Sequence, residues 1–333
     1  MNPLLEVANL SVELTVDGIR RKILRDVSLT VGAGETVGLV GESGSGKSMT
    51  VRAVARLLPR EASVDGEVRF AGDSVFAMRA PALKRFRLHG VSMLFQDSRA
   101  AINPVRTIGD FLTETLRFEE GVSSGAARSR AAAALTDVGI IDAARRLKQY
   151  PHELSGGMLQ RVMITAGLLA GTRLILADEP TSSLDVTTQS EVVAILSDLR
   201  RQRGLALLFV THDLELAAAI CDRIYVMYAG QIVEAQPATT MAAHPAHPYT
   251  QALFAARPSI HSTTGRLRAI PGRSISGYEA PRGCAFADRC PYVQAACQDS
   301  PIALTTRSGG LVRCRRVDEI LPAQEANPES DVV

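Results

Sequence analysis

The sequence has 333 residues, of which 46% are apolar and 22% are charged, so it can bury a sizeable core in one large domain or two moderate ones. Its 37 Lys and Arg residues nearly balance its 35 Asp and Glu residues, which excludes the basic surface typical of nucleic-acid-binding proteins. The longest apolar stretch, residues 162–177, contains Arg173 and two glycines and is shorter than the ~20 residues of a transmembrane helix.

The amino-terminus has neither the basic start nor the long apolar core of a secretory signal. We therefore expect a cytoplasmic protein that crosses no membrane and has no nucleic acid as a partner. Disulfides are disfavoured in that compartment, so the five cysteines need another explanation.

The first part of the chain predicts strands. Residues 4–16, 23–31 and 67–70 are rich in alternating and β-branched apolar residues, which indicates an antiparallel flank. The apolar run 36–40 predicts a buried strand, and a helix is expected over 48–58.

A glycine-rich loop joins that buried strand to that helix, with the pattern Gly-x-x-x-x-Gly-Lys-Ser from Gly41 to Ser48. Glycines let the backbone N–H groups turn inward, and the helix that follows adds the positive end of its dipole, so the loop predicts a polyphosphate site. Lys47 is expected to reach the β and γ phosphates, and Ser48 to bind Mg²⁺. The expected nucleotide-binding residues are Gly41, Ser43, Gly44, Ser45, Gly46, Lys47, Ser48 and Met49.

The middle of the chain predicts an α/β fold. After a strand that ends at Gln96, residues 107–118 and 126–138 have helical spacing, so we expect a helical insertion at about 97–170. Helices and strands then alternate over 158–170, 174–177, 187–203, 205–210 and 213–220. This alternation predicts a mostly parallel sheet covered by helices.

Two further motifs follow the insertion. The strand 174–177 ends in Asp178 and Glu179, and in a phosphate-loop enzyme the first can hold Mg²⁺ while the second faces the attacking water. Upstream, Leu-Ser-Gly-Gly at 154–157 precedes a helix, whose N-terminus can bind a phosphate.

The order of these motifs resembles the nucleotide-binding subunit of an ATP-binding-cassette (ABC) transporter over residues 4–236. The residues that carry the resemblance are the phosphate loop, Gln96, Leu-Ser-Gly-Gly, Asp-Glu-Pro-Thr at 178–181, Ser-Leu-Asp at 183–185 and His212. The resemblance implies MgATP bound between two cassettes packed head to tail, with Ser155, Gly156 and Gly157 of one cassette facing the phosphate loop of the other.

The resemblance also implies roles for single residues. Glu179 is the expected general base, His212 contacts the γ-phosphate and Asp185 crosses the interface between the cassettes. Gln96 senses Mg²⁺ and the attacking water, and its loop faces the membrane subunits. Ser48, Gln96 and Asp178 are the expected Mg²⁺ site.

The carboxyl-terminal part is similar to the extension found in ATPase subunits of dipeptide and oligopeptide importers, through His-Pro-Tyr-Thr at 247–250 and a set of cysteines. This implies a peripheral protein on the cytoplasmic face of the membrane, with two transmembrane permease subunits and an extracytoplasmic peptide-binding protein as partners. The Ser-Gly-Gly-Met-Leu-Gln-Arg-Val-Met-Ile segment at 155–164 resembles the first of two ATPases in such systems, which indicates a heterodimer with a second ATPase subunit.

Alternatives remain open from the sequence. Nickel importers share this cassette type, and the solute is chosen by subunits outside this chain. A soluble ABC protein of translation or repair usually joins two cassettes or carries a long coiled coil, and neither is visible. A scaffold that binds ATP without turnover is disfavoured by the intact Lys47, Asp178, Glu179 and His212.

The composition changes after residue 236, so we expect a cassette over 1–236, an extension over 237–322 and a disordered tail over 323–333. The extension contains Cys284, Cys290, Cys297 and Cys314, whose spacing supports only a four-thiolate metal site of unspecified kind. The resemblance points to a [4Fe–4S] cluster, with zinc or four buried thiols as alternatives. Cys221 is expected in the core.

One departure from the family concerns adenine. The family usually has an aromatic residue upstream of the phosphate loop, yet no Phe, Tyr or Trp precedes Phe70. The matching stretch is 16–21, so we expect an aliphatic or guanidinium contact to the base there, and weak discrimination between ATP and GTP.

Overall fold

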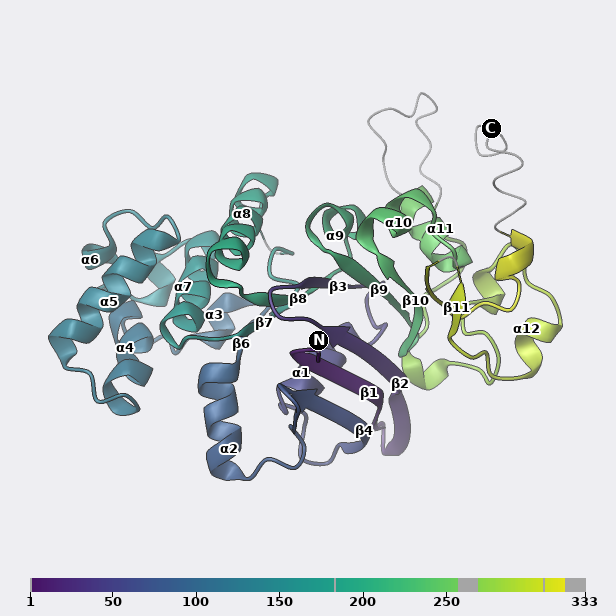
Figure 1. The fold of residues 1–333 in the computed structure, drawn as a ribbon, viewed down its shortest axis with the longest axis horizontal. Helices are drawn as coiled ribbons and strands as arrows, with labels where there is room; N and C mark the ends of the chain where they lie inside the picture. The colour runs from purple at the N-terminus through teal and green to yellow at the C-terminus, as the bar shows by residue number, and fades with distance from the viewer. Residues whose placement is uncertain (1, 183, 257–268, 308, 321–333) are drawn as a thin grey trace.

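The computed structural model describes residues 2–182, 184–256, 269–307 and 309–320 (Figure 1). The disorder expected for 323–333 lies outside the described residues. In Figure 1 the central sheet is flanked by the helical insertion on the left and by the carboxyl-terminal region on the right.

The larger sheet confirms the predicted mostly parallel core. Its strand order is β11-β12-β10-β9-β3-β8-β7-β6, and the neighbours from β9 to β6 pair in parallel. The strands of the cassette are β3 (Thr36–Val40), β6 (Val91–Leu94), β7 (Leu174–Asp178), β8 (Ala206–Thr211), β9 (Arg223–Tyr228) and β10 (Gln231–Pro237). Strands β3, β7 and β8 are buried along their whole length, because helices or the smaller sheet cover both faces.

The smaller sheet is the predicted antiparallel flank. Its order is β2-β1-β4-β5, formed by β1 (Leu5–Val16), β2 (Ile19–Val31), β4 (Ser63–Phe70) and β5 (Asp73–Ser74). Buried side chains of this sheet, such as Leu10 and Leu29, share a core with β3 and with helix α1 (Lys47–Val54). The phosphate loop thus leaves β3 between two packed layers.

The helical insertion was also predicted correctly. Between β6 and β7 lie α3 (Ser98–Ala101), α4 (Ile108–Phe118), α5 (Ser124–Asp137), α6 (Ala143–Arg146), the 3₁₀ turn η2 (Pro151–Glu153) and α7 (Gly156–Leu169). Their buried faces, among them Leu112, Leu135 and Leu159, form one apolar core. Helices α8 (Val186–Arg203) and α9 (Leu214–Ile220) follow, while α2 (Ala80–Arg85) and the π-helical turn η1 (Phe86–Gly90) lead into β6.

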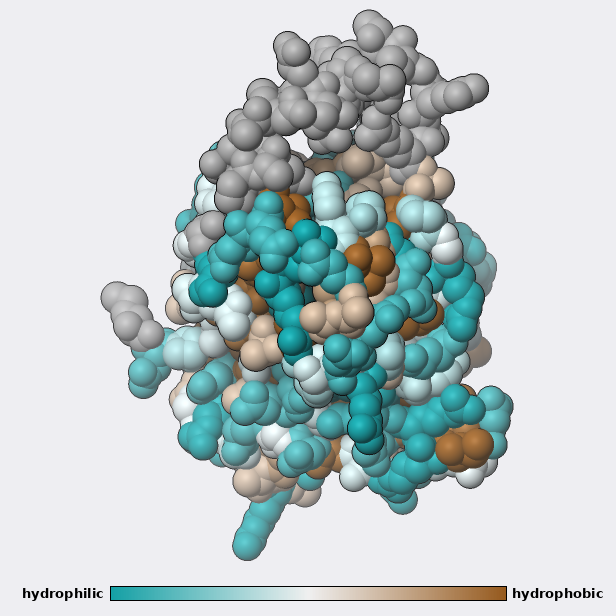
Figure 2. Space-filling model, turned by 90° about the vertical axis from the view of Figure 1, so that its right-hand side faces the viewer, coloured by the Kyte–Doolittle hydropathy of each residue, from teal (hydrophilic) through white to brown (hydrophobic). Residues whose placement is uncertain are grey.

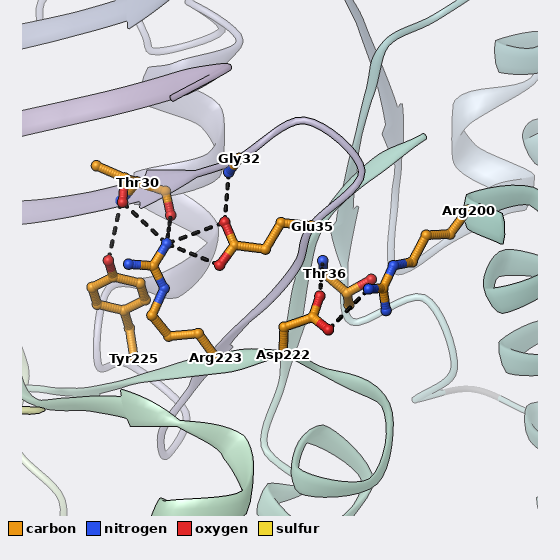
Figure 3. A network of polar contacts seen from close by, with 8 residues as sticks. All are labelled: Thr30, Gly32, Glu35, Thr36, Arg200, Asp222, Arg223 and Tyr225. Atoms are coloured by element: carbon orange, nitrogen blue, oxygen red, sulfur yellow. Dashed lines mark hydrogen bonds and ion pairs between the residues drawn. The ribbon is translucent and has the colours of Figure 1, made fainter. Parts of the chain in front are cut away.

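A polar network joins the two sheets next to the start of β3 (Figure 3). Arg223, at the start of β9, donates to the backbone and hydroxyl oxygens of Thr30 and forms an ion pair with Glu35 at 3.0 Å. The backbone N–H of Thr30 donates to the hydroxyl of Tyr225. The terminal nitrogen Nη2 of Arg223 is therefore bound by β2 and by the loop before β3, while its buried Nε has no hydrogen-bond partner among the described residues.

The carboxyl-terminal region packs onto the cassette. It contains α10 (Ala238–Ala243), α11 (Pro248–Ala255), η3 (Gly277–Glu279), η4 (Ala287–Arg289), α12 (Ala296–Asp299), β11 (Thr305–Arg307) and β12 (Gly310–Val312). Strand β12 pairs antiparallel with β10 and so extends the larger sheet. The ring of Phe286 lies 5.5 Å from that of Tyr228 and 5.3 Å from that of Tyr249.

A buried carboxylate strengthens this attachment. Glu234 on β10 is fully buried and accepts hydrogen bonds of 2.8 Å from the backbone N–H groups of Ala246 and His247. These contacts fix the entry to α11 against the sheet. The boundaries at residues 236 and 322 remain predictions.

The outer face of the carboxyl-terminal region is mainly polar, and the visible apolar residues form small separate patches (Figure 2). Within the described parts of the chain, no helix combines the length and apolar character needed to span a bilayer.

We predict that Arg223→Ala loosens the junction of the two sheets. Hydrogen bonds to a charged group contribute about 1.5–3 kcal/mol to the free energy of unfolding. Loss of these bonds in Arg223→Ala should therefore lower the midpoint of thermal unfolding by roughly 3–8 °C. Arg201→Ala is the control, because Arg201 and its partner Asp198 are exposed and such pairs contribute little. Equal shifts in the two variants would show that the network in Figure 3 does not hold the layers together.

Candidate functional site

The candidate site lies at the carboxyl edge of the parallel strands. Gln96 lies just beyond β6, Glu179 follows β7, His212 follows β8 and the phosphate loop follows β3. They surround one open cavity of about 710 Å³. The residues that line it are Ile23, Glu42, Ser43, Gly44, Gly46, Lys47, Ser48, Met49, Gln96, Glu179, His212, Leu253, Ser276 and Tyr278.

The phosphate loop depends on its glycines. Gly46 has a φ of 109°, a conformation that side chains rarely adopt. A Cβ on Gly41 would lie 2.2 Å from the carbonyl oxygen of Met227. The hydroxyl of Ser45 is buried and has no hydrogen-bond partner among the described atoms, which suits a loop whose donors serve a bound anion.

Lys47 is buried beneath this loop. Its Nζ donates to the carbonyl oxygens of Gly41 at 2.8 Å and Glu42 at 3.0 Å, and lies 3.7 Å from Oε1 of Glu179. Burial lowers the pKa of Lys47, and the nearby carboxylates of Glu179 and Asp178 oppose that shift. The ammonium group therefore lies at the floor of the cavity, held by acceptors on the loop.

Asp178 and Ser48, which were predicted to bind Mg²⁺, contact each other. The hydroxyl of Ser48 donates to Oδ1 of Asp178 at 2.8 Å. Burial raises the pKa of the Asp178 carboxyl group, against the hydrogen bond from Ser48. Carboxylate and hydroxyl oxygens are hard ligands of the kind that Mg²⁺ prefers, and a cation would offset the burial of this charge. The residues present fit the ion.

Glu179 lies between two basic side chains. Its Oε1 faces Lys47, and its Oε2 is 3.7 Å from Nδ1 of His212. Its φ of 47° lies in the left-handed region, which costs of order 1 kcal/mol for a non-glycine residue and often marks a functional position. The carboxylate is only 19% exposed, so it is shielded but still open to the cavity.

Another group of predicted residues lies apart from the cavity and the phosphate loop, namely Ser155, Gly156, Gly157 and Asp185. Ser155 caps α7 by accepting a hydrogen bond from the N–H of Met158, and Asp185 caps α8 by accepting from Thr188. A Cβ on Gly157 would lie 2.2 Å from Cγ2 of Thr188, so the two helix starts lie against each other. Ser155, Gly156 and Asp185 are exposed.

Sequence reasoning missed the contribution of the carboxyl-terminal region to the site. Both terminal nitrogens of Arg289 bind the carboxylate of Glu42, at 2.6 and 3.0 Å. The N–H of Glu42 donates to the hydroxyl of Tyr249 at 2.9 Å. Tyr249 belongs to the motif at 247–250, but no local pattern in the sequence connects Arg289 or Tyr278 with the phosphate loop.

The predicted [4Fe–4S] cluster is wrong. Among the residues that the structure describes, no group of three or more His, Cys, Asp or Glu side chains could hold a metal ion, which also excludes zinc. The four cysteines border a cavity of only about 20 Å³ with apolar neighbours, room for roughly one water molecule. Burial raises the pKa of Cys284 and Cys314 to about 11, so they are neutral thiols at pH 7. Cys221 is in the core, as predicted.

Comparisons with known proteins agree with this architecture. The family model "ABC transporter" matches residues 24–182, and the model "Oligopeptide/dipeptide transporter, C-terminal region" matches residues 233–297. The oligopeptide transport ATP-binding protein OppD of Haemophilus influenzae is 40% identical, over 94% of this chain and 97% of that protein. OppD of Salmonella typhimurium is 38% identical, over 96% of each.

A solved structure has the same fold. It is described as the dimeric structure of a post-hydrolysis state of the ATP-binding cassette MJ0796 bound to ADP and Pi. It is 26% identical, covers 70% of this chain and 98% of its own, and has a TM-score of 0.63. The family model and this likeness support the predicted cassette fold.

We predict that Gly41→Ala weakens binding of a fluorescent ATP analogue by about tenfold or more, because the new Cβ displaces the loop from the backbone of Met227. Gly125→Ala is the control, since a Cβ there meets no atom within 4 Å. Unchanged affinity in a folded Gly41→Ala protein would contradict the assignment of this loop.

Proposed function

Because the chain belongs to the ABC transporter family, among the ATP-binding proteins that have the oligopeptide/dipeptide transporter C-terminal region, we propose that it is the ATP-hydrolysing subunit of a peptide importer. The observation that carries the enzymatic part is the position of Glu179 between Lys47 and His212, in the cavity formed by the phosphate loop.

The side chains have complementary roles in this proposal. The N–H groups of the loop and the ammonium of Lys47 bind the phosphates of ATP, which lie in the cavity. Glu179 accepts a proton from the attacking water. His212 contacts the γ-phosphate, and Gln96, which lines the same cavity, orients the water.

Ser48, Asp178 and Gln96 hold Mg²⁺ in this proposal. When bound, Mg²⁺ neutralises charge on the phosphate oxygens. The hydroxyl of Ser48 donates to the carboxylate of Asp178 at 2.8 Å, so the two oxygens lie close together.

The exposed positions of Ser155, Gly156 and Asp185 favour a head-to-tail pair of cassettes. They form a surface of their own, outside the cavity, beside Val186, whose side chain is 79% exposed. In a pair, the start of α7 of one cassette meets the phosphates bound in the other, where its N–H groups can bind them. The relative MJ0796 is described as a dimer bound to ADP and Pi.

Membrane permease subunits and a second ATPase are the partners of this motor. We propose that the second ATPase is a different chain, that an extracytoplasmic binding protein delivers the peptide, and that the motor acts on the cytoplasmic face of the membrane. The test is copurification with the neighbouring subunits and reconstitution in vesicles. ATP turnover that rises with added peptide supports peptide import, whereas full turnover without membrane subunits contradicts it.

We predict that Glu179→Gln lowers ATP turnover by ~10² to 10⁴-fold, because the amide cannot accept the proton. ATP binding should persist, so closed complexes should accumulate. Glu61→Gln, at an exposed position away from the cavity, is the control and should turn over normally. Near-normal hydrolysis by Glu179→Gln in the assembled transporter would show that Glu179 is not the general base.

A second variant tests the pairing of cassettes. Gly156→Asp places a negative charge where the proposal puts a γ-phosphate, so turnover in the assembled transporter should fall by roughly tenfold or more. Binding of ATP to the isolated chain should be unchanged, because Gly156 lies outside its own cavity. Equal loss of binding and turnover would show that Gly156 acts within its own chain.

A further inference from the structure

The nucleotide cavity contains an aromatic side chain that no sequence motif identifies. Tyr278, in η3 of the carboxyl-terminal region, lines the cavity together with Ile23 of β2 and with Gly44 and Gly46 of the phosphate loop. Ile19 and Arg20, from the stretch where the base contact was expected, are not among the lining residues. The structure therefore places neither of these two residues at the cavity.

Tyr278 lies on the side of the loop opposite to the catalytic groups. The strands that supply His212, Glu179 and Gln96 follow one another on one side of β3, in the order β8, β7 and β6. Gly277 packs instead against Gly230, in the turn between β9 and β10 on the other side of β3. A nucleotide with its γ-phosphate beside Glu179 therefore extends its base toward Tyr278 and Ile23.

The ring is held in place by contacts to β2. A Cβ on Gly277 would lie 2.0 Å from the carbonyl oxygen of Ile23, so only glycine allows η3 to approach the strand this closely. Arg25 donates to the carbonyl oxygens of Gly277 at 2.9 Å and Ala280 at 3.4 Å. Reciprocal bonds between Ser276 and Glu279 close the turn itself.

A cation lies against the same ring. The guanidinium carbon of Arg21 is 4.8 Å from the centroid of Tyr278, a cation–π distance. Arg21 is not among the cavity-lining residues, whereas Tyr278 is, so the ring contacts both the guanidinium and the cavity. The ring is half-buried and held by the guanidinium of Arg21, which preorganises it for stacking.

We propose that Tyr278 is the stacking surface for the adenine of ATP, so that the carboxyl-terminal region supplies the aromatic side chain that is missing upstream of the phosphate loop. Ile23 offers an aliphatic contact next to it, and Arg21 orients the ring. This proposal rests on the proposed function, because it assumes that the cavity binds a nucleoside triphosphate.

The first test compares ATP with inorganic tripolyphosphate, which has the phosphates but no base, on the purified full chain by titration calorimetry. Tyr278→Ala should weaken ATP binding by about 5- to 30-fold, the range expected for loss of one base–aromatic stack, and leave tripolyphosphate binding unchanged. Tyr278→Phe should bind ATP like the wild type. A merely structural role of Tyr278 would weaken both ligands equally and so overturn the proposal.

The second test does not depend on the folding of Tyr278→Ala. The protein contains no tryptophan, so Tyr278→Trp introduces a single indole reporter at the proposed stacking position. ATP should quench its fluorescence, while tripolyphosphate should leave it nearly unchanged. The control is Tyr292→Trp, because Tyr292 is not among the residues that line the nucleotide cavity. The fluorescence of its indole should respond to neither ligand.

The outcomes separate this proposal from the proposed function. If the wild-type chain binds neither ATP nor tripolyphosphate, the cavity is not a nucleotide site and both proposals fail. If it binds both ligands but Tyr278→Ala binds ATP as the wild type does, or the indole at position 278 responds equally to both ligands, only the assignment of adenine to Tyr278 fails.

Discussion

Parallel strand pairing is the constraint on which the site depends. Because β3, β6, β7 and β8 run in the same direction, the residues that follow them meet at one edge of the sheet. Chain segments more than a hundred residues apart thereby place Lys47 and Glu179 within 3.7 Å of each other. The backbone that builds this edge is buried and paired, so the positions of these charges are rigid.

Burial and charge oppose each other at this edge. Lys47 and Asp178 are both removed from water, which disfavours the charged form of each, and each has partners of opposite charge or polarity within reach. Buried ion pairs of this kind contribute little to the free energy of unfolding. We therefore explain their presence by a role in the reaction and not by a role in folding. The left-handed backbone at Glu179 belongs to the same pattern.

The sequence predicted the cassette well because its signals are local. The glycines and Lys47 of the phosphate loop, the alternation of strands and helices, and the order of motifs each lie within a short window of the chain. The contacts that it could not predict join distant segments. Arg289 and Glu42 are 247 residues apart, and Tyr278 reaches the cavity through a turn that packs on Ile23. The cysteine spacing misled as well, because spacing along the chain does not show whether four thiols that border one cavity can hold a metal ion.

The carboxyl-terminal region therefore helps to form the cavity that we propose as the nucleotide site. Glu42 is the second residue of the phosphate loop. Its carboxylate accepts hydrogen bonds from Arg289, and its backbone N–H donates to the hydroxyl of Tyr249. A loop that must be preorganised for phosphate is thus stiffened from outside the cassette.

The ion pair between Glu42 and Arg289 joins a segment that is synthesised early to one that is synthesised late. The phosphate loop leaves the ribosome long before Arg289 has been made, and chains fold largely from the amino-terminus as they emerge. Until Tyr278 and Arg289 have been translated, the carboxylate of Glu42 lacks the guanidinium of Arg289 and the cavity lacks the ring of Tyr278. A nascent chain that ends before these residues therefore has an incomplete cavity.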